Sequence, residues 1–434
     1  MKKLLFIALA VVLALSVALV GCNAPTDYTL TIASTSGGSV FPAAGDHTYG
    51  SGQTVNIKAT PASEYYQFVN WTGDVGTVDD VNAAETTVTM NGDYSITANF
   101  EALPWDSTVT LTFHATISDR ASIVEFVYRP WIDELKALTG TQGGKFDVVE
   151  TYGDAPFDAT ASLSAISTGT VDMGQLSGDT FHLGGIGFLP FFFPDMESAA
   201  YATYHLWTEG NGKWDANHQL SDVKILISTP LWGMQWWGNV DVRTPDDVEG
   251  VKVRSEANEG PALLALGAIP VQLGTSDLGT ALQTGTVEGC FFTYSGIGGF
   301  SGVGPNTQYT TEVNLYYRSY SLAMNRDVYD ALPAEAREAL DSICGAERSM
   351  YWAAQHKAGE ADAKDETITG PMFPPPAHPE WGRTPYEPTP AELQLWEDAT
   401  ANVAGDWATY MTGTLGFDGA GILARAQALI AAAP

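Results

Sequence analysis

One arginine stands out as a residue that could hold an anionic ligand. Arg254 ends the apolar, strand-like segment 251–254, in a chain that has 20 Lys and Arg against 51 Asp and Glu. A guanidinium presents a planar pair of donors that matches a carboxylate. We therefore predict that Arg254 is the lone cation that binds a ligand carboxylate. The alternative is a structural ion pair with one of the many acidic residues.

The residues that most often carry catalysis form no recognisable arrangement. The 7 His are scattered without metal-ligand spacing, and no Gly-x-Ser-x-Gly, dinucleotide-binding or Walker pattern occurs. We predict that the protein is not an enzyme and uses no metal and no cofactor. His114 is either a hydrogen-bonded strand-end residue or part of a cleft wall. Cys290 and Cys344 either form a disulfide or remain two buried thiols.

The composition narrows the possible partners. The formal net charge of −31 argues against binding to nucleic acid and against adsorption on an anionic membrane surface. Hydrophobic residues make up 45% of the chain and aromatic residues 11%, which is ample for packed cores.

The first 22 residues have the order of an export signal. Lys2 and Lys3 precede an uncharged apolar run over 4–20, and the segment ends in Gly21 and Cys22. This order resembles the bacterial lipobox, which implies cleavage before Cys22 and lipidation of its thiol. The alternative is an uncleaved anchor helix. The lipoprotein interpretation predicts an extracytoplasmic protein anchored to the cell membrane, in the periplasm or on the outer face.

Residues 27–101 predict a small all-β domain. Short alternating runs are broken by turn residues such as Gly37-Gly38 and Asn91-Gly92, and no helical period occurs. The order of these runs resembles the divergent B-repeat of internalins, which implies a β-grasp-like fold. With one copy beside the anchor, the domain is either a spacer or an adhesive or glycan-binding module. Residues 101–107 are interpreted as a linker.

Residues 107–434 alternate strands with helices. Strands are predicted at 109–113, 146–151, 223–228 and 251–254, with a helix at helical spacing over 124–138. This alternation predicts an α/β fold with parallel sheets and ligand sites at the strand ends. We expect a mobile surface loop over 296–304 and an extended arm in the Pro-rich segment 371–388.

An ordered set of motifs places this large region in a family. The motifs lie at 166–173, 189–193, 243–254, 266–271 and 276–289. They resemble those of the solute-binding proteins of tripartite ATP-independent periplasmic (TRAP) transporters, of the dicarboxylate-binding, DctP-like type. The resemblance implies a two-lobed, Venus-flytrap receptor like other periplasmic binding proteins. It would deliver a small organic acid to the TRAP membrane subunits. The alternative function is a surface adhesin or glycan-binding lipoprotein.

The resemblance also implies the site. Arg254 matches the family arginine that pairs with the ligand carboxylate. Sugar-acid members carry a second Arg where this chain has Met234, and an Asn where it has Phe292, which disfavours a sugar acid. An apolar pocket with one Arg suits a monocarboxylate with an apolar body. The candidate ligand-binding residues are Arg254, Trp232, Met234, Gln235, Trp236, Phe292, Tyr294, Ser177 and His114.

Overall fold

The computed structural model describes residues 27–62, 66–119, 121–153, 155–209, 219–256, 258–299, 303–369 and 384–434. The chain divides into two compact units, one formed mainly by residues up to Pro104 and the other mainly by residues from Trp105 onward. The signal and Cys22 lie outside the described residues, as do positions 371–383 of the Pro-rich segment. In the described ranges, no helix combines the length and apolar character needed to cross a bilayer.

The first unit is all-β, as the sequence predicts. One sheet has the order β3-β1-β7-β5 and the other β2-β4-β6. Alternate residues of each sheet, such as Ile32 and Ile57, point into a shared core around Trp71. The elements are β1 (Asp27–Ser34), β2 (Gly38–Phe41), β3 (Gly45–Gly50), β4 (Thr54–Pro61), β5 (Tyr66–Gly73), the 3₁₀ turn η1 (Val75–Thr77), β6 (Glu85–Thr89) and β7 (Tyr94–Ala102).

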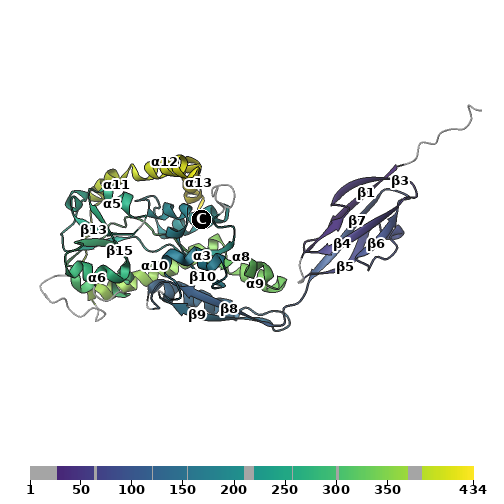
Figure 1. The fold of residues 1–434 in the computed structure, drawn as a ribbon, viewed down its shortest axis with the longest axis horizontal. Helices are drawn as coiled ribbons and strands as arrows, with labels where there is room; N and C mark the ends of the chain where they lie inside the picture. Colours follow the sequence, from purple (N-terminus) through teal and green to yellow (C-terminus); the bar gives the residue numbers. More distant parts are fainter. Residues whose placement is uncertain are drawn as a thin grey trace, which may run out of the picture. The chain divides into compact units, whose positions relative to one another are not determined.

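The second unit contains two five-stranded sheets, and each sheet forms the centre of one lobe (Figure 1). The sheet of lobe 1 has the order β11-β17-β10-β8-β9. Its elements are β8 (Thr108–Ala115), η2 (Val124–Tyr128), α2 (Arg129–Ala137), β9 (Lys145–Tyr152), η3 (Ala159–Ala161), α3 (Ser162–Ser167), β10 (Met173–Ser177), η4 (Gly178–Thr180), η5 (His182–Phe188), α4 (Met196–Glu209), β11 (Val223–Ser228), β17 (Tyr320–Asn325), α8 (Arg326–Ala331) and α9 (Ala334–Ser342).

The sheet of lobe 2 has the order β14-β13-β15-β12-β16. Its elements are β12 (Gln235–Gly238), η6 (Pro245–Val248), β13 (Lys252–Ser255), α5 (Gly260–Ala265), β14 (Ile269–Gln272), α6 (Thr275–Gln283), β15 (Gly289–Phe292), α7 (Tyr294–Gly299), η7 (Gly304–Asn306) and β16 (Tyr309–Thr311). The two-lobed α/β architecture agrees with the expected receptor fold.

The prediction of parallel sheets is only partly right, because both sheets are mixed. Strands β8, β9 and β10 are parallel, and so are β13, β14 and β15. Strand β17 runs antiparallel to β10 and β11, and β12 runs antiparallel to β15 and β16. Both β17 and β12 enter their sheets from the other lobe, which reverses their direction.

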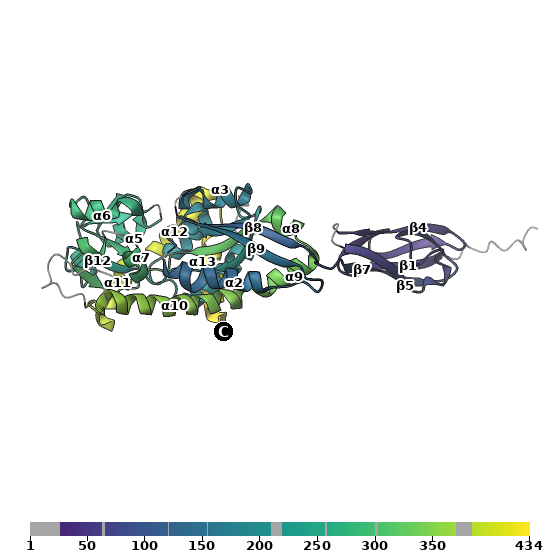
Figure 2. The same cartoon turned by 90° about the horizontal axis from the view of Figure 1, so that it is seen from below.

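Two chain segments and a long helix connect the lobes. Residues 229–234 lead from β11 to β12, and residues 312–319 lead from β16 to β17. The two segments are hydrogen-bonded to each other, with Leu231 N donating to the Arg318 carbonyl at 2.9 Å and Met234 N to that of Tyr316 at 3.1 Å. Helix α10 (Ala346–Thr369) packs on α4 and η2 of lobe 1 and on α7 of lobe 2, so it runs beneath both lobes (Figure 2).

The C-terminal helices cross between the lobes again. They are α11 (Pro390–Thr400), α12 (Val403–Leu415) and α13 (Gly419–Ala432). Helix α11 packs on α5 in lobe 2, whereas α13 packs on α4 in lobe 1. Helix α11 begins with a capping box, in which Thr389 and Glu392 bond each other's backbone N–H.

Three local predictions need correction. Trp105, assigned to the linker, is buried in the lobe 1 core with its ring 4.7 Å from that of Phe146. The predicted Gly-rich loop begins as helix α7, where Gly296 fits because any Cβ would meet the Phe292 ring at 2.2 Å. Cys290 and Cys344 are free thiols in different cores, so the disulfide alternative is wrong.

A buried glutamate on α10 joins the two lobes. Glu360 accepts hydrogen bonds from Ser122 of lobe 1 at 2.6 Å and from the backbone N of Ser295 in α7 at 3.1 Å. The Ser295 hydroxyl also donates to it. Burial alone would raise the pKa of Glu360, but hydrogen bonds from His356, Ser122 and Ser295 outweigh it and lower the pKa. The ionised carboxylate therefore stabilises the packing of α10 against both lobes.

We predict that Glu360→Gln lowers the thermal midpoint. The free energy of unfolding should fall by about 1.5–3 kcal/mol, because the variant loses hydrogen bonds to a charged group. Because the folded pKa lies below the ordinary value of 4.5, the stabilisation is complete above that pH and is lost as the pH falls through the folded pKa. The difference between wild type and variant should therefore shrink in acid. Calorimetry from pH 7 to pH 3 measures this, with Glu347→Gln, exposed on the same helix, as the control. Equal loss in both variants would contradict it.

Candidate functional site

A cavity of about 730 Å³ lies between the two lobes. Its walls follow the carboxyl ends of β8, β13 and β15, which is where α/β sheets bind ligands. Both lobes and both connecting segments contribute. The lining residues are Thr116, Ile117, Ser118, Ala121, Ile123, Phe157, Asp158, Ala159, Thr160, Leu231, Met234, Arg254, Glu256, Glu259, Gly274, Thr275, Ser276, Phe291, Phe292, Thr293, Ser295, Gly296, Arg318 and Tyr320.

Arg254 lies at the end of β13, lines this cavity, and is only 1% exposed. Its Nη2 donates to Thr275 Oγ1 at 2.9 Å and to Glu256, and its Nη1 lies 3.6 Å from Glu259 Oε1. Its Nε and Nη1 have no hydrogen-bond partner among the described residues. Arg254 therefore forms the structural ion pairs of the second interpretation, and its role in ligand binding stays a prediction.

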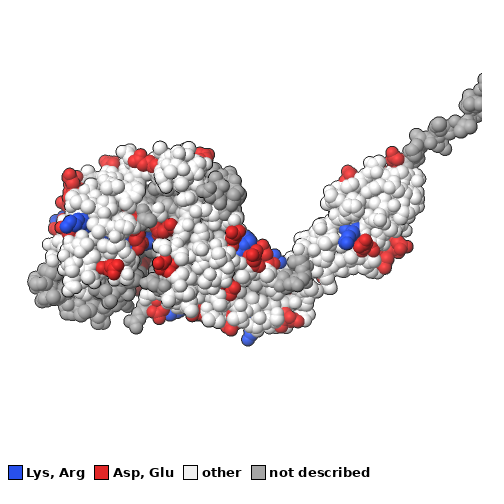
Figure 3. All heavy atoms as spheres, viewed as in Figure 1, with Lys and Arg blue, Asp and Glu red and all other residues white. Residues whose placement is uncertain are grey.

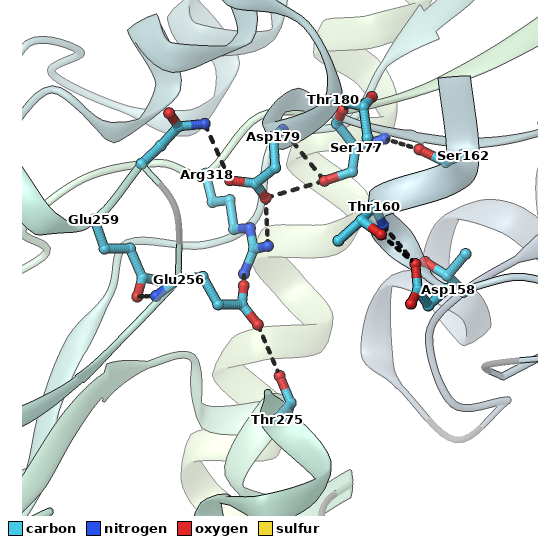
Figure 4. A network of polar contacts seen from close by, with 12 residues as sticks. Asp158, Thr160, Ser162, Ser177, Asp179, Thr180, Glu256, Glu259, Thr275 and Arg318 are labelled. Atoms are coloured by element: carbon cyan, nitrogen blue, oxygen red, sulfur yellow. Dashed lines mark hydrogen bonds and ion pairs between the residues drawn. The ribbon is translucent and has the colours of Figure 1, made fainter. Parts of the chain in front are cut away.

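A second arginine lies in the cavity, so the expectation of a lone cation is wrong. Arg318, from the segment that connects β16 to β17, lies between two carboxylates (Figure 4). Its Nη2 is 2.5 Å from Asp179 Oδ2, and its Nη1 is 2.5 Å from Glu256 Oε2. Asp179 belongs to lobe 1 and Glu256 to lobe 2. These contacts link the lobes through one guanidinium.

The two glutamates after Arg254 differ in their electrostatics. Burial would raise the pKa of Glu256, but Arg318 and Arg254 outweigh this effect and lower the pKa. Glu259 is more deeply buried, and desolvation raises its pKa despite the nearby Arg254. Its Oε1 accepts a hydrogen bond from the Tyr316 hydroxyl at 3.0 Å. Glu256 is therefore the ionised carboxylate that faces the cavity, with 22% of its side chain exposed.

Three of the predicted site residues come together at the cavity, namely Arg254, Met234 and Phe292. The Phe292 ring centroid lies 5.6 Å from Arg254 Cζ. Met234 supplies no second guanidinium at the position that the resemblance singled out, and Arg318 brings one to the cavity from the segment that connects β16 to β17.

The three other candidates around β12 and β15 are not among the lining residues. Trp236 is in the lobe 2 core, with Nε1 donating to the Val240 carbonyl at 3.1 Å. Gln235 is buried, with Nε2 donating to the Gly233 carbonyl at 2.8 Å. The Tyr294 hydroxyl donates to Glu312 at 2.5 Å. Their positions give no support to direct ligand contact.

The remaining three candidates also lie away from the cavity wall. Trp232 packs against Met196 and Ala200 of α4. Ser177 donates to Asp179 Oδ2 at 3.1 Å, so it supports the partner of Arg318. His114 Nδ1 is 2.9 Å from Thr151 Oγ1, and its ring packs on Phe157 at 4.4 Å. His114 is the hydrogen-bonded strand-end residue of the two alternatives.

Sequence reasoning missed Arg318, Glu256, Glu259 and Asp179. Arg318 lies in the aromatic run 316–320 of a chain with few cations, which is the same signal that singled out Arg254. The two glutamates follow Arg254 by two and five residues, so their proximity was also visible. Asp179 carried no such signal, since only the fold brings it to Arg318.

The cavity combines buried guanidinium groups with an apolar wall. That wall includes Ile117, Ile123, Phe157, Leu231, Phe291 and Tyr320. A guanidinium beside aromatic residues suits a small carboxylate with an apolar body. Within the described ranges, no group of His, Cys, Asp and Glu has the arrangement of a metal site.

Comparisons with known proteins agree with this fold and identify the family. Residues 135–381 match the family model of bacterial extracellular solute-binding protein, family 7. Residues 28–104 match the divergent InlB B-repeat domain. The C4-dicarboxylate-binding periplasmic protein DctP of Rhodobacter capsulatus is 26% identical over 285 residues, which cover 60% of this chain and 76% of that protein.

Solved structures show the same fold. A TRAP solute-binding protein from Rhodoferax ferrireducens, in complex with copurified benzoate, has a TM-score of 0.64 and 23% identity, covering 75% of this chain and 98% of that one. One from Bordetella bronchiseptica with bound (R)- and (S)-mandelate has a TM-score of 0.59 and 19% identity, covering 75% and 99%. This chain therefore belongs to family 7 of the bacterial extracellular solute-binding proteins and carries a divergent B-repeat domain before its receptor domain.

Proposed function

We propose that this protein is the solute receptor of a TRAP transporter. It binds a small organic acid, most simply a monocarboxylate with an aromatic or apolar body. It then delivers this acid to the membrane permease. The observation that carries the proposal is the interlobe cavity, where the buried Arg254 guanidinium lies beside Phe292 and its Nε donates no hydrogen bond among the described residues. Solved relatives hold benzoate and mandelate. A built cavity of this kind favours a receptor over an adhesin or glycan-binding lipoprotein.

Binding is expected to proceed by closure of the two lobes. The cavity wall draws on both lobes and on segments 229–234 and 312–319, so a ligand that touches all of them stabilises one relative position of the lobes. Helix α10 and the two connecting segments are the hinge. Closure would remove the ligand carboxylate from water, which makes its pairing with a guanidinium decisive.

The N-terminal features suit a receptor held at a membrane. Cys22 is the proposed site of lipidation, and acyl chains contribute about 0.8 kcal/mol per buried CH₂ group to anchoring. The B-repeat domain would then be a spacer between the lipid and the receptor. Such a protein works outside the cytoplasm, on the cell membrane. Its acidic surface, on which Asp and Glu exceed Lys and Arg in Figure 3, fits a small-molecule ligand better than nucleic acid.

Arg254→Ala should weaken acid binding by more than about a hundredfold, or about 3–5 kcal/mol, because a buried carboxylate loses its cation. Arg254→Lys should restore only part of the affinity, since an ammonium lacks the planar pair of donors. The measurement is calorimetric titration with the acid that gives the largest stabilisation in a thermal-shift screen. Circular dichroism controls for folding, because Glu256 and Glu259 lose a partner. Equal affinities of folded wild type and Arg254→Ala would mean that the ligand is held elsewhere.

Cys22→Ala should prevent lipidation, so the protein should leave the detergent phase in phase-partitioning of whole cells. Substitution of Ser39, far from the lipobox in the sequence, serves as the control and should partition like wild type. A processed Cys22→Ala protein that still partitions into detergent would refute the anchor.

A truncated protein that begins at Ser107 would lack Trp105, which is buried in the lobe 1 core. We therefore expect a protein that begins at Pro104 to bind the acid with the affinity of one that begins at Asn23, and the protein that begins at Ser107 to have a lower thermal midpoint. Titration and thermal melting of the three test this. Loss of binding on removal of the repeat alone would contradict its role as a spacer.

A further inference from the structure

Glu256 already forms ion pairs with both arginines of the cavity. One of its oxygens accepts from Arg254 Nη2 and lies 3.2 Å from Thr275 Oγ1, and the other lies 2.5 Å from Arg318 Nη1. Its backbone N donates to Glu259 Oε2 at 2.8 Å, which fixes the residue from behind. Figure 4 shows the Glu256 carboxylate between Arg318 and Thr275. A carboxylate of the chain itself therefore stands where a ligand carboxylate would be expected.

The charges around the cavity leave no excess of cation. The charged lining side chains are Asp158, Arg254, Glu256, Glu259 and Arg318, and Asp179 pairs with Arg318 from behind. Even if Glu259, whose pKa is raised by burial, is left out of the count, the three carboxylates of Asp158, Asp179 and Glu256 stand against two guanidinium groups. A plain monocarboxylate would add one more negative charge to this set, whereas a ligand with a balancing positive group would add none.

Arg254 can nevertheless accept a carboxylate without losing Glu256. Its Nε and Nη1 donate no hydrogen bond among the described residues, while Nη2 holds Glu256. Nη1 also lies 3.6 Å from Glu259 Oε1, so Nε is the donor left for a ligand, and it is buried in this structure. A ligand carboxylate that reached Nε when the lobes adjust would lie next to the Glu256 carboxylate. A positive group one carbon away from the ligand carboxylate would then face Glu256, and the apolar body would face Phe157 and Phe292.

We propose that Glu256 makes this site selective for a zwitterionic acid, an α-amino acid with an apolar or aromatic side chain, over the corresponding plain anion. The inference rests on the proposed function, since it specifies the class of acid that the receptor binds. The contact that carries it is the ion pair between the ligand ammonium and Glu256, next to the pair between the ligand carboxylate and Arg254.

Matched ligand pairs test the proposal on the full chain. Mandelate and phenylglycine share the phenyl ring and the carboxylate, but mandelate carries a hydroxyl where phenylglycine carries an ammonium. Pyroglutamate and proline form a second pair with a five-membered ring, in which the ring nitrogen is a neutral lactam in pyroglutamate and an ammonium in proline. Wild type should bind the zwitterion of at least one pair about tenfold more tightly or better, and Glu256→Gln should reduce that preference by about tenfold or more. Asp277→Asn is the control, because it removes an exposed carboxylate near the cavity that does not line it.

The outcomes separate this inference from the proposed function. If wild type binds mandelate at least as tightly as phenylglycine and pyroglutamate at least as tightly as proline, the inference is overturned and the receptor function is left intact. A zwitterion preference that Glu256→Gln retains also overturns it, since the charge of Glu256 would then not be the cause. If Glu256→Gln does not fold, the preference of wild type decides by itself. If folded wild type binds neither pair nor any acid of a wider screen, the proposed function fails as well.

Discussion

The pairing of two buried arginines with carboxylates of the same chain is the constraint on which this receptor depends. A guanidinium without a partner in a cavity of this kind would be strongly destabilising, so Arg254 and Arg318 must be neutralised before any ligand arrives. Asp179 performs this role from lobe 1 and Glu256 from lobe 2. The same contacts therefore neutralise the buried guanidinium charges and connect the two lobes. They also affect which ligand charges the cavity can bind.

The topology explains why these groups meet. The parallel strands of each lobe, such as β8 and β10 or β13 and β15, direct their carboxyl ends to the cavity, so Arg254 at the end of β13 and Asp179 just after β10 approach it from opposite sides. Arg318 lies on one of the segments that connect the lobes. Glu360 on α10 accepts hydrogen bonds from Ser122 of lobe 1 and from Ser295 of lobe 2. Charged groups at the points of connection make lobe position and site electrostatics interdependent.

Much of the fold could be predicted from the sequence, and less of the site. Strand and helix periodicity and the turn at Asn91-Gly92 are local signals, so they survive in the structure, although β6 and β7 on either side of that turn belong to different sheets. Trp105 falls in the predicted linker because it lies between the two predicted domains, yet Gly140 and Gly144 leave room for its ring in the lobe 1 core. Aromatic residues near Arg254 were equally good candidates by composition, but Trp236 and Tyr294 point into cores whereas Phe292 lines the cavity.

By itself, the sequence determined the all-β repeat, the α/β receptor region and the place of Arg254 at a strand end, and it predicts an export signal. Periodicity, turn chemistry and ordered motifs are properties of neighbouring residues, and a single chain displays them directly. The tertiary structure alone decided that Asp179, Glu256 and Arg318 form one network, because these residues come from a lobe 1 turn, a lobe 2 strand end and a connecting segment. Their charges act through distance in space, and separation along the chain carries no information about that distance.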